Sequence, residues 1–196
     1  IPLTRAVVRG SKRALVVADL PFGSYESSPE QALSTSTRFF KEAGAMAVKL
    51  EGAHLATVEK LTAAGIPVMG HLGLTPQSLH QLGGYRVQGR TDGDAILEAA
   101  LALEKAGAFA IVLELVPAEL AARISKALTV PTIGIGAGTD CDAQVLVWTD
   151  MAGLTANPPK LAKAYRNLRK ELMGAAQEFA EEVRSGKFPT ESQTFH

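Results

Sequence analysis

The chain has 196 residues, a formal net charge of zero and a hydrophobic fraction of 46%. It is long enough for one globular domain with a sizeable core. The balanced charge excludes a general nucleic-acid binder, the single cysteine excludes an intrachain disulfide, and no apolar run approaches the roughly 18 residues of a membrane span. We therefore expect a soluble, cytoplasmic protein of one domain, residues 1–196, with no nucleic-acid or membrane partner.

Short apolar runs alternate with helical patterns along the chain. The expected strands are residues 14–19, 46–51, 66–71, 109–114, 131–135 and 144–148. The expected helices are residues 28–43, 53–64, 94–106, 117–128 and a long amphipathic helix at 159–185, followed by an irregular tail at 186–196. Residues 1–10 have the pattern of the end of a helix, so we expect further chain upstream of Ile1.

Strands that alternate with helices indicate an α/β protein with a parallel sheet. A doubly wound open sheet and a (β/α)8 barrel both fit this alternation. Polar residues at the carboxyl ends of several strands favour the barrel, because barrel active sites are built at those ends. These polar residues are Asp19, Glu51, His71 and Glu114. We expect a (β/α)8 TIM barrel in which the sequence lacks about the first two βα units, since it falls short of the roughly 250 residues typical of that fold.

Two carboxylates are expected to meet at this end of the sheet. Asp19 and Glu51 end strands that are neighbours in the barrel, and they would repel each other unless a cation lies between them. Oxygen ligands from few protein groups suit Mg²⁺, which keeps waters or substrate oxygens in its other positions. The alternative is structural: an ion pair between Lys49 and Glu51, which alternate onto the same side of a strand, or acids that cap helices.

Two other strand ends carry candidate catalytic groups. Glu114 follows five apolar residues, so desolvation would raise its pKa and make it a candidate general base. It could instead pair with a nearby Arg or Lys, and His71 could be an ordinary hydrogen-bonding residue. The glycine run at 134–138 could bind phosphate, but it lacks the spacing of a dinucleotide-binding motif.

The ordered set of these segments resembles the ketopantoate hydroxymethyltransferase family over nearly the whole chain. The most specific segments are His-Leu-Gly-Leu-Thr-Pro-Gln-Ser at 71–78 and Gly-Gly-Tyr-Arg-Val-Gln-Gly-Arg at 83–90. The others are Ala-Asp-Leu-Pro-Phe at 18–22, Val-Lys-Leu-Glu-Gly at 48–52, Leu-Glu at 113–114 with Val-Pro at 116–117, and Ile-Gly-Ile-Gly-Ala-Gly at 133–138.

The resemblance implies Mg²⁺-dependent transfer of a hydroxymethyl group from 5,10-methylenetetrahydrofolate to 3-methyl-2-oxobutanoate, giving 2-dehydropantoate in pantothenate biosynthesis. It implies that Asp19 and Glu51 bind the metal, with a further acid upstream of residue 1. By the same resemblance Asp19, Lys49 and His71 contact the substrate, and Glu114 accepts the proton. It also implies a homo-oligomer, a decamer, that acts on small molecules.

Two departures from the family pattern stand out. The first two barrel strands, with an Asp-Ser pair, are absent from this sequence. Ala53 and Ala143 stand where the family pattern has glycine, which would matter if those positions needed a positive φ; we expect them to be tolerated.

Two competing hypotheses remain. One is a barrel enzyme of the phosphoenolpyruvate mutase and isocitrate lyase type that acts on another 2-oxo acid with Mg²⁺; the segments around 76–78 and 87–90 argue against it. The other is a non-catalytic barrel fragment that serves as a component of an oligomer.

Overall fold

A computed structural model describes residues 1–196, which form two compact units, Ile1–Val145 and Leu146–His196. The hydrophobic core lies within the first unit: its buried residues all lie between Ala18 and Ala137. No residue of the long C-terminal helix α7 (Leu168–Ser185) is buried.

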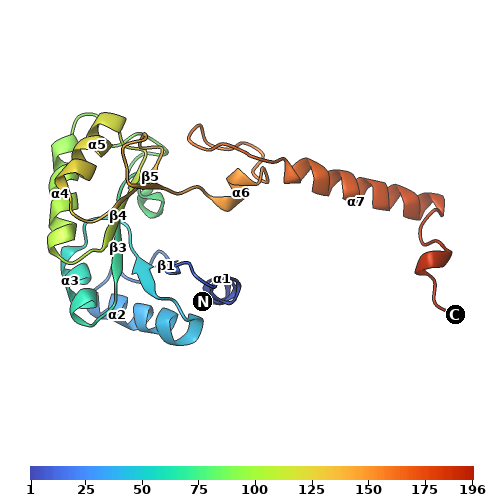
Figure 1. Ribbon diagram of the computed structural model, residues 1–196, viewed down its shortest axis with the longest axis horizontal. Helices are drawn as coiled ribbons and strands as arrows, with labels where there is room; N and C mark the ends of the chain where they lie inside the picture. Colours follow the sequence, from blue (N-terminus) through green and yellow to red (C-terminus); the bar gives the residue numbers. More distant parts are fainter. The chain divides into compact units, whose positions relative to one another are not determined.

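The first unit is built on a six-stranded sheet whose strands follow one another in sequence order (Figure 1). The strands are β1 (Val17–Asp19), β2 (Ala47–Lys49), β3 (Val68–Gly73), β4 (Ala110–Glu114), β5 (Thr132–Ile135) and β6 (Ala143–Gln144). All five neighbouring pairs are parallel. A doubly wound sheet would reverse its strand order at a switch point, and this sheet has no reversal. The unit is therefore a parallel α/β half-barrel.

The helices of the first unit lie where the sequence predicted them, to within a few residues at each end. They are α1 (Pro2–Gly10), α2 (Pro29–Arg38) with its π-helical continuation η1 (Phe39–Ala43), α3 (Leu55–Ala63), α4 (Gly93–Lys105) and α5 (Ala118–Ala127). The predicted start of α2 is confirmed, because the Ser28 side chain accepts a hydrogen bond from the Gln31 N–H at 3.1 Å. Its predicted end is confirmed as well, since Gly44 adopts a left-handed φ of 78°.

Apolar residues on both faces of the strands hold the helices against the sheet. In β4 the four residues from Ala110 to Leu113 are all buried, which is typical of a parallel strand covered on both sides. Only the last residue of that strand, Glu114, is partly exposed. The packing therefore leaves the carboxyl end of the strand as the place where a polar group reaches the edge of the core.

Two elements differ from the prediction. The strand expected at 144–148 is limited to the two exposed residues of β6, and Trp148 begins a short helix, α6 (Trp148–Met151). The long helix expected to begin at residue 159 begins at Leu168 instead, because the Asn167 side chain caps it by accepting a hydrogen bond from the Lys170 N–H at 3.1 Å. In the tail, which was predicted to be irregular, one 3-10 turn forms, η3 (Glu191–Gln193).

None of the helices combines the length and the apolar character that crossing a membrane would require.

Candidate active site

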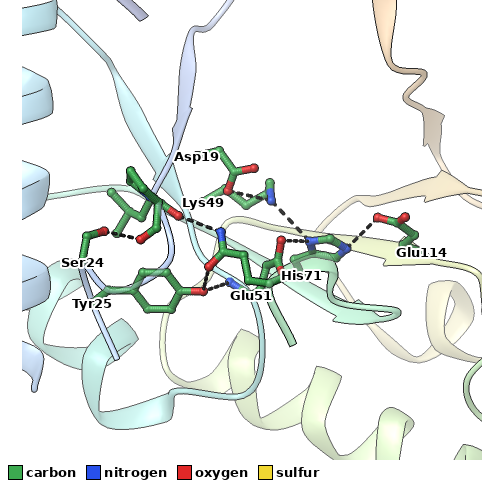
Figure 2. Close-up of polar contacts among 10 residues, drawn as sticks. Asp19, Ser24, Tyr25, Lys49, Glu51, His71 and Glu114 are labelled. Carbon is green, nitrogen blue, oxygen red and sulfur yellow. Dashed lines mark hydrogen bonds and ion pairs between the residues drawn. The ribbon is translucent and has the colours of Figure 1, made fainter. Parts of the chain in front are cut away.

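The five candidate residues come together at the carboxyl edge of the sheet (Figure 2). Asp19 is the last residue of β1 and pairs in register with Lys49, the last residue of β2. Glu51 follows two residues later, His71 lies within β3, and Glu114 ends β4. Parallel strands end at one edge, so side chains from four successive strands converge there.

Lys49 and His71 connect the acids at the two sides of this cluster. The Lys49 Nζ lies 2.8 Å from Asp19 Oδ1 and 3.3 Å from His71 Nδ1. An ammonium group can only donate, so His71 Nδ1 is the acceptor and the ring proton is on Nε2. That Nε2 lies 3.2 Å from Glu114 Oε2, although the two groups are not aligned as a hydrogen bond. Lys49 thus pairs with Asp19, and not with Glu51 as the structural alternative, a Lys49–Glu51 ion pair, required.

Glu51 is a buried carboxylate with one strong donor. Its Oε2 accepts a hydrogen bond from the Gln77 N–H at 2.9 Å, while Oε1 lies 3.8 Å from His71 Nδ1. Burial raises the pKa of Glu51, and the charge of Asp19 raises it further. The Gln77 N–H, His71 and the Lys49 ammonium oppose that rise without cancelling it. Glu51 therefore has an oxygen that the protein leaves without a close donor.

Tyr25 and Gln77 belong to the same cluster and were not identified from the sequence. The Tyr25 hydroxyl donates to Gln77 Oε1 at 2.7 Å and accepts from the Glu51 N–H at 3.2 Å. Burial raises the pKa of Tyr25 to about 12, so the phenol keeps its proton at neutral pH. Gln77 lies in the 71–78 segment, one of the two most specific segments of the family resemblance. No local pattern in the sequence marks Tyr25, which follows β1 by six residues.

The donor set at this edge fits a hard cation. Asp19 is more than half exposed and Glu51 is almost completely buried, and both present carboxylate oxygens. No group of three or more His, Cys, Asp or Glu residues is arranged to hold a metal ion by itself. Two carboxylates leave positions for water or substrate oxygens, which is the manner in which Mg²⁺ is usually bound.

The backbone around Glu114 is tightly constrained. Gly73, which pairs with Glu114, has a φ of +89°, and a Cβ there would lie 2.2 Å from the Glu114 carbonyl oxygen. Leu115 has the only positive φ of any non-glycine residue, 46°. Its N–H donates to the Ile135 carbonyl and its carbonyl accepts from Gln88, both at 2.9 Å. The strand end that carries the candidate base is therefore fixed by its neighbours.

Local geometry accounts for Gly138 in the glycine run and for the two alanines. A Cβ at Gly138 would lie 2.6 Å from the Ala118 Cβ, so the close approach of this loop is to helix α5. Ala53 and Ala143 have no positive φ, which agrees with the expectation that alanine is tolerated at both positions.

An open hollow within the second unit is a different kind of feature. It is lined by residues of the loop before α7 and of its first turns, including Arg166, Arg169 and Lys170. It contains none of the five candidate residues, no histidine and no carboxylate.

Comparison with known families identifies strong relatives over the whole chain. The family model described as "Ketopantoate hydroxymethyltransferase" matches residues 1–191. The protein named 3-methyl-2-oxobutanoate hydroxymethyltransferase from Frankia alni is 62% identical over 199 residues, covering 100% of this chain and 66% of its own length. The protein of the same name from Thermobifida fusca is 61% identical, with coverage of 100% and 71%. The chain thus spans about two thirds of the length of these relatives.

Solved structures support the fold. A phosphoenolpyruvate phosphomutase from Streptomyces platensis subsp. rosaceus matches with a TM-score of 0.54 and 14% identity, over 94% of this chain and 67% of its own. A phosphonopyruvate hydrolase, solved in complex with oxalate and Mg²⁺, matches with a TM-score of 0.52 and 18% identity, over 100% and 70%. At such low identities the similarity is one of fold alone.

Proposed function

This chain belongs to the ketopantoate hydroxymethyltransferase family, and we propose on that basis that it transfers a hydroxymethyl group from 5,10-methylenetetrahydrofolate to 3-methyl-2-oxobutanoate. The products are 2-dehydropantoate and tetrahydrofolate, with one water consumed. The observation that carries the proposal is the continuous line of contacts from Asp19 through Lys49 and His71 to Glu114. This line places cationic, hydrogen-bonding and basic groups at one edge of the sheet, as proton abstraction beside a carbonyl requires.

Asp19 and Glu51 are the proposed Mg²⁺ ligands. When bound, the cation supplies Lewis acidity toward the oxygens of a 2-oxo acid. The protein's own contribution is to present two carboxylates, one exposed and one buried, from neighbouring strand ends. We propose that a further acid of the site lies upstream of residue 1, as in the family pattern.

Lys49 and His71 orient the substrate and the base. The Lys49 ammonium lies between Asp19 and His71, where its positive charge can stabilise negative charge that develops on the keto oxygen. His71 Nε2 lies 3.2 Å from Glu114 Oε2, so the imidazole stands beside the carboxylate that we propose as the proton acceptor.

Glu114 is the proposed general base. It takes the proton from C3 of 3-methyl-2-oxobutanoate, the carbon next to the keto group, and the electron pair released at C3 forms the new bond to the one-carbon unit. Its side chain is 14% exposed, so it sits at the boundary between the core and the carboxyl edge. The tight backbone at Gly73 and Leu115 keeps it there.

We propose that the half-barrel is the larger part of a (β/α)8 barrel. The strand order without reversal, the likeness to larger barrel-type enzymes and the greater length of the relatives support this arrangement. A decameric assembly and a cytoplasmic location are proposed from the family resemblance alone.

Turnover with defined substrates tests the proposal. The protein is incubated with Mg²⁺, 5,10-methylenetetrahydrofolate and 3-methyl-2-oxobutanoate, and 2-dehydropantoate is measured by mass spectrometry. Product that forms with Mg²⁺ and is lost with EDTA is the expected result.

The two competing hypotheses predict other outcomes in the same assay. Turnover of phosphonopyruvate or another 2-oxo acid in place of 3-methyl-2-oxobutanoate would identify a mutase-type or lyase-type enzyme. No turnover of any 2-oxo acid, together with no Mg²⁺ binding, would identify a non-catalytic fragment. Sequence identities of 57–62% to the hydroxymethyltransferases, against 14–18% to the mutase and hydrolase, favour the first result.

A further inference from the structure

Three hydrogen bonds form a closed ring around the backbone and side chain of Glu51. The Glu51 N–H donates to the Tyr25 hydroxyl, the hydroxyl donates to Gln77 Oε1, and the Gln77 N–H donates back to Glu51 Oε2. Each member both donates and accepts, so no single bond can be removed without opening the ring. Hydrogen bonds arranged in this way reinforce one another in a buried setting.

The ring also reaches the segment that carries the other acid. The Gln77 side-chain amide donates to the Leu20 carbonyl at 2.9 Å, and Leu20 follows Asp19 directly. Tyr25 lies in the loop after β1, Glu51 in the loop after β2 and Gln77 in the turn after β3. The network therefore links three loops at the carboxyl edge and fixes the segment of Asp19 relative to that of Glu51.

We propose that Tyr25 and Gln77 are positioning residues that hold Glu51 and Asp19 at the separation needed to bind one divalent cation. Tyr25 is only 2% exposed, so its hydroxyl acts through the ring and touches neither substrate nor cation. Outer-shell partners of this kind are known to tune metal affinity by about 10- to 100-fold. The inference rests on the proposed function only in taking Asp19 and Glu51 as the ligands.

Cation binding by Tyr25→Phe is the direct test. The substitution removes one oxygen and so opens the ring of hydrogen bonds. It leaves the volume of the aromatic side chain almost unchanged. Binding of Mn²⁺, which shares the oxygen ligands of Mg²⁺, is titrated by electron paramagnetic resonance without either substrate. The expected result is a Kd raised by about tenfold or more. Gln77→Met, which keeps the backbone N–H to Glu51 but loses both side-chain bonds, should raise the Kd in the same direction.

A matched control separates positioning from general stability. Ser125→Ala removes a different hydrogen bond within the first unit, from Ser125 Oγ to Thr132 Oγ1 at 2.6 Å, and should leave the Mn²⁺ Kd unchanged. The double variant of Tyr25 and Gln77 should bind no more weakly than the worse single variant, since either substitution alone opens the ring. A purely structural role predicts lower unfolding midpoints for all of these variants and the wild-type Kd for each.

The outcomes distinguish this inference from the proposed function. A wild-type Kd in Tyr25→Phe overturns the inference, and it leaves the hydroxymethyltransferase activity intact as a proposal. If the wild type forms no 2-dehydropantoate but Tyr25→Phe still binds Mn²⁺ more weakly than the wild type does, the inference is supported and the proposed reaction is overturned. A wild-type protein that does not bind Mn²⁺ contradicts both.

Discussion

Glu51 and Glu104 are two glutamates of the same unit that the fold uses in opposite ways. Glu104, in helix α4, places Oε1 against three donors: the Thr129 N–H at 2.6 Å, the Thr129 hydroxyl at 2.8 Å and the Val130 N–H at 3.0 Å. The Thr129 N–H is the main cause of a lowered pKa of Glu104. Glu51 has one backbone donor, and burial raises its pKa.

The difference separates an acid that closes a turn from an acid that is available to a ligand. A carboxylate whose charge is satisfied by backbone N–H groups stabilises the fold, and few of its lone pairs remain free to bind a ligand. A carboxylate held in the core with an oxygen free of close donors costs stability until a cation or substrate satisfies it. Glu51 belongs to the second kind, and Glu114 with its unaligned histidine partner is close to it.

Replacing the candidate base should give the largest effect. Glu114→Gln keeps the size of the side chain and removes its basicity, so kcat should fall by roughly 10²- to 10⁴-fold. Glu104→Gln, the same chemical change at a turn, should leave kcat at the wild-type value. Steady-state kinetics with 3-methyl-2-oxobutanoate measure both. Full activity in Glu114→Gln would show that another group accepts the proton.

The next effect is on cation affinity. Glu51→Gln removes a buried carboxylate that has only one close donor, so calorimetric titration should show Mg²⁺ binding weakened by more than the roughly tenfold typical of an outer-shell change. In EDTA the same variant should be at least as stable as the wild type, because the desolvation cost of the charge is gone. Clear destabilisation in EDTA would place Glu51 with Glu104 as a structural acid.

A smaller effect is expected where the backbone positions the base. Gly73→Ala forces a Cβ to 2.2 Å from the Glu114 carbonyl at a φ of +89°, and should lower the free energy of unfolding by about 2 kcal/mol or more. Gly65→Ala is the matched control, because Gly65 has a φ of +81° but no heavy atom within 4 Å of an added Cβ. This substitution should therefore cost only the backbone strain of about 1 kcal/mol, with no steric clash. Denaturant titration measures both, and equal losses would show that the contact with Glu114 is not constraining.

Periodicity and residue type predicted the order and kind of nearly every element in the first unit. They succeeded because strands such as 109–114 are buried on both faces and because Ser28 and Gly44 mark helix ends by local chemistry. They failed at residues 144–148 and 159–167, where the decisive factors are an exposed edge strand and the cap at Asn167.

Asp19, Lys49, Glu51, His71 and Glu114 were predicted as candidate site residues, whereas Tyr25 and Gln77 were not. Asp19, Glu51 and Glu114 interrupt apolar runs, and that interruption is visible in a sequence. Tyr25 lies in a loop, and its role depends on a contact with Gln77, 52 residues further along the chain. The pairing of Lys49 with Asp19 rather than with Glu51 likewise depends on the strand register, which brings the two residues side by side.

Glu104, whose side chain accepts hydrogen bonds from the turn at Thr129 and Val130, provides the last and smallest test. Glu104→Gln keeps an acceptor for Thr129 and Val130 but removes the charge, and the site is largely solvated, so the loss of stability at pH 7 should be under about 0.5 kcal/mol. Because the pKa of Glu104 is lowered from 4.5 in the folded state, its contribution is present above pH 4.5 and is lost as the pH falls through the lowered pKa. Wild type and variant should therefore converge in stability at low pH. Denaturant titrations across that range measure the convergence, and a constant difference between them would show that the charge of Glu104 does not support the turn.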